Sequence, residues 1–156
     1  MSTFDNYIGR EVVLGEHLFT ADDIITFALK YDPQPFHTDP EAARNSLFGG
    51  LCASGWHTTA VFMQLNVEFI KSVIKECIRN GETPPTFGPS PGIENLSWIK
   101  PVFAGDRLTY FQKVVSVRPL TSRPGWSMIA MTPRAINQHG EDVLRFDSAA
   151  MIRLPA

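Results

Sequence analysis

The chain has 156 residues, with 14 lysines and arginines against 16 aspartates and glutamates and a formal net charge of -2 at pH 7. This length suits one domain with a real core, which we place at residues 1–156. The slightly acidic balance offers no basic surface for a nucleic-acid backbone or an anionic membrane, so we expect neither as a partner.

The sequence shows no pattern typical of a secretion signal, a membrane span, a disulfide or a metal site. Residues 1–7 lack the basic and apolar segments of a secretion signal, and no uncharged apolar run approaches membrane-spanning length. We therefore expect a cytoplasmic protein. Cys52 and Cys77 have neither CxxC spacing nor histidines in a ligand pattern, so we expect two small core residues without disulfide or metal site.

The first part of the chain predicts a strand followed by short helices. Residues 10–19 alternate between apolar and more polar side chains, which is typical of a strand with one better-buried face. Thr20 is a candidate N-cap with Asp23 three residues later, and helical spacing of apolar residues continues to Tyr31. Asp39, followed by a proline, predicts the start of a second helix that ends before residues 49–50.

The segment between these helices, Tyr31-Asp32-Pro33-Gln34-Pro35-Phe36-His37-Thr38-Asp39-Pro40, is the main candidate for chemistry. Its prolines fix their own φ and push the residues before them towards extended conformations, so we expect no helix here. A carboxylate and an imidazole, Asp32 and His37, then lie on a rigid loop. A pair of this kind can share proton transfer near neutral pH.

A long helix is predicted from about Ser54 to about Asn80. Apolar residues recur there at alternating steps of four and three, the period of one helix face. Charged residues are concentrated in its second half. We therefore expect a buried front end and a back end that emerges into solvent.

The rest of the chain predicts a loop and four antiparallel strands. Four prolines in residues 81–92 indicate an irregular connection. Alternating stretches follow at residues 93–102, 106–117, 126–136 and 143–154, with turn residues at 104–106 and 137–140 that suit hairpins. The element order is an α+β pattern in which a sheet wraps the long helix.

Three segments resemble a known family. Residues 32–37 are similar to the hydratase motif D-x-N-P-x-H of MaoC-like dehydratases, which are related to (R)-specific enoyl-CoA hydratases. Ser54-Gly55 stands where that family usually has His-Gly, and residues 98–106 resemble its strand and turn entering the sheet. The resemblance implies a hot-dog fold, in which an antiparallel sheet wraps a long central helix.

By this resemblance, Asp32 and His37 bind one water molecule and move protons during reversible hydration of a trans-2-enoyl-CoA or a related acyl thioester. The protein would then be a hydro-lyase of fatty acid metabolism. Such a reaction needs a base for water and a donor for the thioester oxygen, and the amide of Gly55 at a helix start suits the second role. Ser54 would cap the helix or contact the ligand, and Trp56 would line the site.

Two departures leave alternatives open, because Gln34 replaces the asparagine of the motif and Ser54 replaces the usual histidine. A hot-dog acyl-CoA thioesterase and a non-catalytic acyl-thioester binding module are the alternatives that we retain. No metal or redox cofactor is expected, since the substrate itself carries coenzyme A or a related carrier. The resemblance also implies a homodimer, with a site between subunits to which residues 81–92 of a neighbour would contribute.

Overall fold

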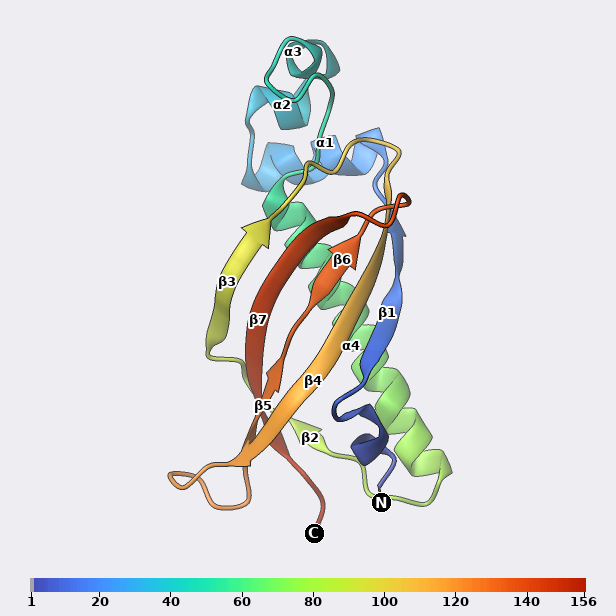
Figure 1. Cartoon of the computed structure of the whole chain (residues 1–156), viewed down its shortest axis with the longest axis vertical. Helices are drawn as coiled ribbons and strands as arrows, with labels where there is room; N and C mark the ends of the chain where they lie inside the picture. Colours follow the sequence, from blue (N-terminus) through green and yellow to red (C-terminus); the bar gives the residue numbers. More distant parts are fainter. Residues whose placement is uncertain (1) are drawn as a thin grey trace.

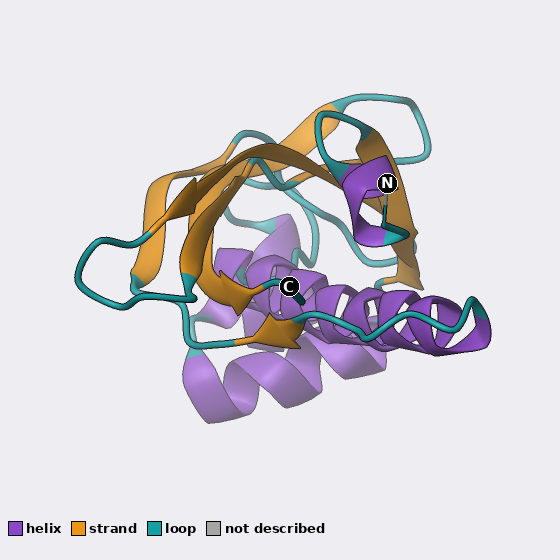
Figure 2. Ribbon diagram, turned by 90° about the horizontal axis from the view of Figure 1, so that it is seen from below, coloured by secondary structure: helices purple, strands orange, loops and turns teal. Residues whose placement is uncertain are grey.

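In the computed structural model, which describes residues 2–156, a strongly bent antiparallel sheet curves over one long helix, α4 (Gly55–Arg79). Figure 2 shows the sheet arching over this helix. The helices before α4 are η1 (Phe4–Tyr7), α1 (Ala21–Tyr31), α2 (Pro35–Thr38) and α3 (Pro40–Arg44). The strands are β1 (Glu11–Leu18), β2 (Thr86–Phe87), β3 (Gly92–Trp98), β4 (Arg107–Pro119), β5 (Ser127–Met131), β6 (Arg134–Ile136) and β7 (Asp142–Arg153).

The sheet has the order β1-β4-β5-β7-β2, with β3 on β7 and with β6 between β4 and β7, and every one of these strand pairs is antiparallel. This arrangement confirms the predicted α+β hot-dog fold. Helices α1 to α3 gather at the end of the sheet where α4 begins, at the top of Figure 1. The predicted catalytic segment is therefore carried to the start of the long helix.

The predicted helix starts are present because polar side chains satisfy their free amides. The hydroxyl of Thr20 accepts from the N–H of Asp23 at 3.2 Å, which starts α1. Asp39 accepts from the N–H groups of Glu41 and Ala42, which starts α3. No helix within residues 2–156 is long and apolar enough to cross a membrane.

Three predictions for the part of the chain after α4 were wrong. Residues 104–106 do not join a hairpin, because β3 pairs with β7 and β4 pairs with β1, β5 and β6. The connection at residues 81–92 contains β2, whose two residues pair with the end of β7. The strand predicted at 126–136 is divided into β5 and β6, with Pro133 between them, because a proline cannot donate to a central ladder.

The helix α4 is covered by the sheet on one side only. Val61, Phe62, Val73 and Cys77 are buried, so the back end of the helix is not simply exposed as predicted. Conversely, three residues of the predicted apolar face remain half exposed: Trp56 (54%), Met63 (51%) and Val67 (40%). A wide apolar arc of the helix thus includes one stripe under the sheet and a second stripe open to the outside.

Both free cysteines are buried, as predicted for core residues. Cys77 packs in the core cluster at the end of α4 that also contains Phe4, Val73 and Ile129. A second cluster lies nearer the start of the helix, where the rings of Phe62 and Phe146 meet edge to face with centroids 4.9 Å apart. These clusters hold α4 and the short helices in place.

Candidate active site

Asp32 lies at the end of α1, and His37 lies on the short helix α2 that follows it. Asp32 is the C-cap residue of α1, and its N–H donates to the carbonyl of Ala28 at 2.8 Å. His37 lies on α2, so the prediction of no helix between residues 31 and 40 was wrong. Pro35 is the first residue of α2, a position where the missing N–H costs nothing and the fixed φ favours a helical turn.

The two side chains of the dyad face each other. The Nε2 atom of His37 lies 3.4 Å from Oδ2 of Asp32. His37 is 6% exposed as a residue, which places the pair at the edge of the protein interior. One water molecule placed beside this gap could hydrogen-bond to both atoms.

Two side chains donate hydrogen bonds to the Asp32 carboxylate. The hydroxyl of Ser54 donates to Oδ2 and the amide of Gln34 donates to Oδ1, both at 2.7 Å. Burial raises the pKa of Asp32, but the hydrogen bonds from Gln34 and Ser54 and the nearby charge of His37 together outweigh it, so the pKa lies below its usual value of 3.8. Asp32 is therefore ionised at neutral pH.

The backbone carbonyl of Cys52 sets the orientation of His37. It lies 2.6 Å from Nδ1 of the imidazole, and a carbonyl oxygen only accepts hydrogen bonds. The ring therefore carries a proton at Nδ1. In neutral His37 this leaves a lone pair on Nε2, the atom that faces Asp32.

The start of α4 forms the third part of the site. Ser54 is its N-cap and also accepts from the N–H of Trp56 at 3.3 Å. Gly55 is the first helical residue, and its N–H has no acceptor within the helix or elsewhere among residues 2–156. A free amide at the positive end of a long helix suits a developing negative charge.

Gly55 is also required by packing. A Cβ added there would lie 2.2 Å from a ring atom of Trp98, which covers the helix start from β3. The indole N–H of Trp98 donates to the hydroxyl of Thr59 at 3.2 Å, and the ring meets Trp56 edge to face. Close packing against Trp98 is therefore one reason for glycine at this position.

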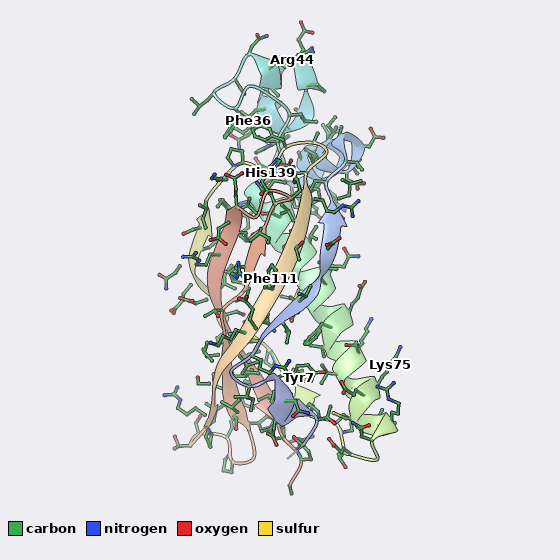
Figure 3. All side chains as sticks on the ribbon, turned by 45° about the vertical axis from the view of Figure 1, so that its right-hand side comes forward. Tyr7, Phe36, Arg44, Lys75, Phe111 and His139 are labelled. Carbon is green, nitrogen blue, oxygen red and sulfur yellow. The ribbon has the colours of Figure 1, made fainter. Side chains whose placement is uncertain are left out.

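Asp32, His37 and Gly55 line one cavity of about 450 Å³, and Trp56 lines it too. The remaining wall comes from the short helices, the segment between α3 and α4, the start of α4, the end of β3 with the segment after it, and β7, and it includes Phe36, Phe48, Trp98 and Lys100. Figure 3 shows Phe36 among these short helices, far from Lys75 near the other end of α4. The structure thus brings three predicted groups and one predicted wall residue together.

Of the two roles expected for Ser54, the structure shows the helix cap. Ser54 is completely buried and does not line the cavity, so its side chain holds Asp32 and the helix start and does not reach a ligand. The Cys52 carbonyl and the Trp98 ring are site components that sequence reasoning missed. The backbone carbonyl of any residue could have played the first role, so no residue type signals it.

His57 lies outside this cavity. Its ring stacks on Phe27 with centroids 4.6 Å apart and an interplanar angle of 7°, and it lines a separate hollow beside α1. Among residues 2–156, no cluster of three or more histidine, cysteine, aspartate or glutamate side chains could hold a metal ion.

Comparison with known proteins agrees with this geometry. A family model described as "MaoC like domain" matches residues 3–124. The chain belongs to this MaoC-like family. The match includes Asp32, His37 and Gly55 as well as the whole of α4, so the candidate site lies within the part of the chain that defines the family.

Solved structures and one curated relative extend the comparison. The MaoC-like dehydratase from Rhodospirillum rubrum is 36% identical, with a TM-score of 0.79 over 100% of this chain and 99% of that one. The (R)-hydratase from A. caviae involved in PHA biosynthesis is 23% identical, with a TM-score of 0.64 over 95% and 96%, a likeness of fold. The uncharacterized protein YdeM of Bacillus subtilis is 30% identical over 67% of this chain and 66% of its own length.

Proposed function

We propose that this MaoC-like protein is a hydro-lyase that adds water reversibly to a trans-2-enoyl-CoA or a related enoyl thioester. The observation that carries the proposal is the convergence of Asp32, His37 and the unpaired N–H of Gly55 on one cavity. Family membership and the likeness to a dehydratase at 36% identity support the same class of reaction.

The dyad positions the water. Ionised Asp32 and the Nε2 lone pair of neutral His37 are both acceptors, so a water bound between them donates one hydrogen to each. Its oxygen lone pair then points away from the dyad, towards a substrate in the cavity. Orientation of this kind lowers the barrier by removing the need to order the reactants at the moment of reaction.

The helix start stabilises the charge that develops. When the water oxygen bonds to the β-carbon, the electrons of the double bond shift towards the α-carbon and the thioester oxygen. The Gly55 N–H and the dipole of α4 favour the resulting oxyanion. The proton lost by water enters the dyad, and a proton from the dyad is delivered to the α-carbon, so the enzyme returns to its starting state.

The proposed enzyme needs no redox cofactor, because this addition transfers neither electrons nor hydride, and it needs no metal, because the Gly55 N–H and the dipole of α4 stabilise the oxyanion. Coenzyme A or a related carrier belongs to the substrate. We further propose that the protein acts in the cytoplasm. We also propose that it is a homodimer, because half-exposed apolar side chains on α4 and the free side of β3 offer a surface for a second copy.

An assay with crotonyl-CoA tests the reaction class. Hydration lowers the enoyl absorbance without releasing thiol, whereas a thioesterase releases thiol that a disulfide reagent detects. Asp32→Asn and His37→Ala should each reduce hydration by at least about 100-fold, in the range of general acid–base effects. Loss of enoyl absorbance together with thiol release would support the thioesterase, and binding without turnover in wild type and both variants would support a non-catalytic module.

A further inference from the structure

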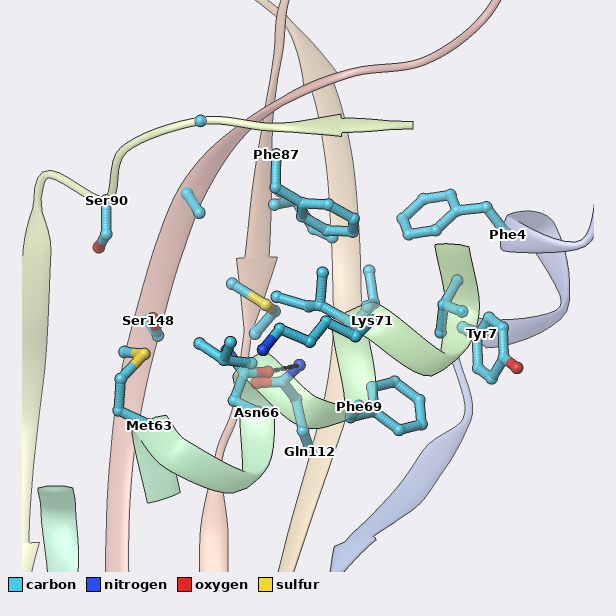
Figure 4. Close-up of a pocket in the computed structure, with 18 residues that line it drawn as sticks. Phe4, Tyr7, Met63, Asn66, Phe69, Lys71, Phe87, Ser90, Gln112 and Ser148 are labelled. Atoms are coloured by element: carbon cyan, nitrogen blue, oxygen red, sulfur yellow. Dashed lines mark hydrogen bonds between the residues drawn. The ribbon is translucent and has the colours of Figure 1, made fainter. Parts of the chain in front are cut away.

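A second cavity, of about 440 Å³, lies between the middle of α4 and the inner face of the sheet. Figure 4 shows its wall, with Phe4 and Phe87 at one end and Met63 and Ser90 at the other. Most of the wall is aliphatic or aromatic, and its polar members are Asn66, Lys71, Ser90, Gln112 and Ser148. The cavity shares no lining residue with the candidate active site, so it is a separate feature of the fold.

Two of the polar side chains of this wall are hydrogen-bonded to each other. The side-chain amide of Gln112 donates to that of Asn66 at 3.3 Å, which joins β4 to α4 across the cavity. Gln112 is only 6% exposed, and its Oε1 atom is buried without a hydrogen-bond partner in the part of the chain that the structure describes. An unpaired buried acceptor is unfavourable and is rare in native proteins.

Gln112 occupies a position on β4 where the strand pattern predicts an apolar side chain. Leu108, Tyr110, Gln112 and Val114 alternate along β4 and all face α4, so an apolar residue is expected at position 112. The polar tip of Tyr110 is satisfied, because its hydroxyl donates to the carbonyl of Thr58 at 2.8 Å. Only Gln112 on this face brings a polar group that the protein leaves unmatched.

The two cavities are connected by apolar surface. Trp56 lines the candidate active site and a shallow apolar hollow beside it, and Met63 lines that hollow and the second cavity. Asn66 follows Gly55 by eleven positions on α4, which corresponds to about 16 Å along the helix axis. A medium-length acyl chain with its thioester at Gly55 would reach the amide pair.

We infer that this cavity binds the acyl chain of the substrate and that the Gln112–Asn66 pair recognises a hydroxyl group near the far end of that chain. The inference rests on the proposed function. A hydroxyl both donates and accepts, so it matches the amide pair in either orientation of the two side chains. A plain hydrocarbon chain would leave the Gln112 oxygen unpaired.

Binding of saturated thioesters tests this without any turnover by hydration. Calorimetry would compare dodecanoyl-CoA with ω-hydroxydodecanoyl-CoA on the wild type, on Gln112→Leu and on the control Gln64→Leu. Gln64 lies on the same helix as Asn66 but lines a different hollow. We expect the wild type and Gln64→Leu to bind the hydroxylated compound about 5-fold to 10-fold more tightly, as one net hydrogen bond would give, and Gln112→Leu to lose or reverse this preference.

Thermal unfolding of the same variants separates recognition from folding. Since the Gln112 oxygen is unpaired, Gln112→Leu should unfold at the same or a higher temperature than the wild type. Equal affinities in the wild type, no binding of either compound, or a preference that survives Gln112→Leu would overturn the inference. If the preference depends on Gln112 but crotonyl-CoA is not hydrated, the recognition of a hydroxyl group in this cavity is supported and the proposed reaction is refuted. If crotonyl-CoA is hydrated but the preference is absent, the proposed reaction is supported and the hydroxyl recognition is refuted.

Discussion

At the scale of single residues, Ser54 connects the helix start to the catalytic carboxylate. Its hydroxyl donates to Asp32 and accepts from the N–H of Trp56, and the residue is fully buried. The side chain thus orients Asp32 and caps α4 at once. Replacing the family's usual histidine by serine leaves the dyad with a short, rigid support.

Ser54→Ala should therefore affect both activity and stability. Loss of the hydrogen bond should raise the pKa of Asp32, so the acid limb of the kcat/KM profile should move to higher pH. The lost cap and hydrogen bond should cost about 1–3 kcal/mol of unfolding free energy. The lowered pKa of Asp32 stabilises the folded protein at pH values above 3.8, the ordinary pKa of this side chain, and this contribution is lost as the pH falls through the lower pKa of the folded state. The difference in unfolding free energy between the wild type and Ser54→Ala should therefore shrink in acid.

Ser72→Ala is the matched control for this variant, since its exposed hydroxyl on the same helix only donates to the carbonyl of Phe69. Urea unfolding at several pH values and a pH–rate profile would measure both effects. An unchanged profile for Ser54→Ala would show that Ser54 does not act on Asp32.

Gly55→Ala tests the close packing at the helix start. The new Cβ would meet the Trp98 ring at 2.2 Å, so the ring must move and the fold should lose roughly 1–3 kcal/mol. Gly50→Ala is the control, because its Cβ would meet Phe103 at an ordinary 3.7 Å. The double variant Gly55→Ala/Trp98→Ala should recover part of the loss in thermal unfolding. A loss that persists in full without the Trp98 ring would point to another cause.

At the scale of elements, α1, β1 and α4 meet around His57. Burial and the nearby His17 lower the pKa of His57 to about 4, against a small opposing effect of Asp23. The ring is stacked on Phe27, and its Nδ1 atom is buried without a hydrogen-bond partner among residues 2–156. This junction therefore contains a histidine that must stay neutral.

The stability of the protein should fall in weak acid for this reason. Between an unfolded pKa of 6.5 and a folded pKa of about 4, the unfolded chain binds the proton first, so stability decreases as pH falls through this window, by roughly 2 kcal/mol. His57→Phe should flatten that part of the profile of unfolding free energy against pH. The exposed His139, replaced in the same way, should leave it intact, and a profile equally steep in His57→Phe would contradict this explanation.

The elements differ in how far the sequence predicts them. Helices α1, α3 and α4 were predictable because their N-caps Thr20, Asp39 and Ser54 precede clear helical segments. The turn α2 was not, because prolines 33 and 35 were both read as helix breakers, although a proline at the first position starts a helix. The partner strands of β3 and β4 could not be deduced, since adjacency in sequence favours the wrong hairpin.

The candidate site divides in the same way. Asp32, His37 and Gly55 stand out because their residue types and spacing carry the chemistry, and the structure gathers them around one cavity. The Cys52 carbonyl and the covering ring of Trp98 come from segments that only the tertiary fold brings near. Contacts of this kind leave no local pattern in a single sequence.

At the scale of the whole molecule, the outer stripe of α4 and the strand β3 form one apolar border. Trp56, Met63 and Val67 are half exposed, and Ile93 on β3 is 40% exposed beside a side of this strand that no other strand of residues 2–156 covers. Exposed apolar surface next to an open sheet edge favours association with a second copy.

Sedimentation should therefore show a dimer that Ile93→Lys weakens by at least about 10-fold in Kd, because a charge would be buried in the contact. Leu29→Lys on α1 is the control, since Leu29 is 64% exposed and lies away from β3. A wild-type monomer with full activity would refute both the dimer and a site shared between subunits.

The destination of the water oxygen tests the central claim most directly. Incubating the protein with crotonyl-CoA in water enriched with heavy oxygen and analysing the products by mass spectrometry would locate that atom. The account predicts heavy oxygen in the β-hydroxyl of an intact thioester, made by the wild type and by neither Asp32→Asn nor His37→Ala. Heavy oxygen in the carboxylate of a released acid, or equal labelling of the β-hydroxyl by the variants, would contradict it.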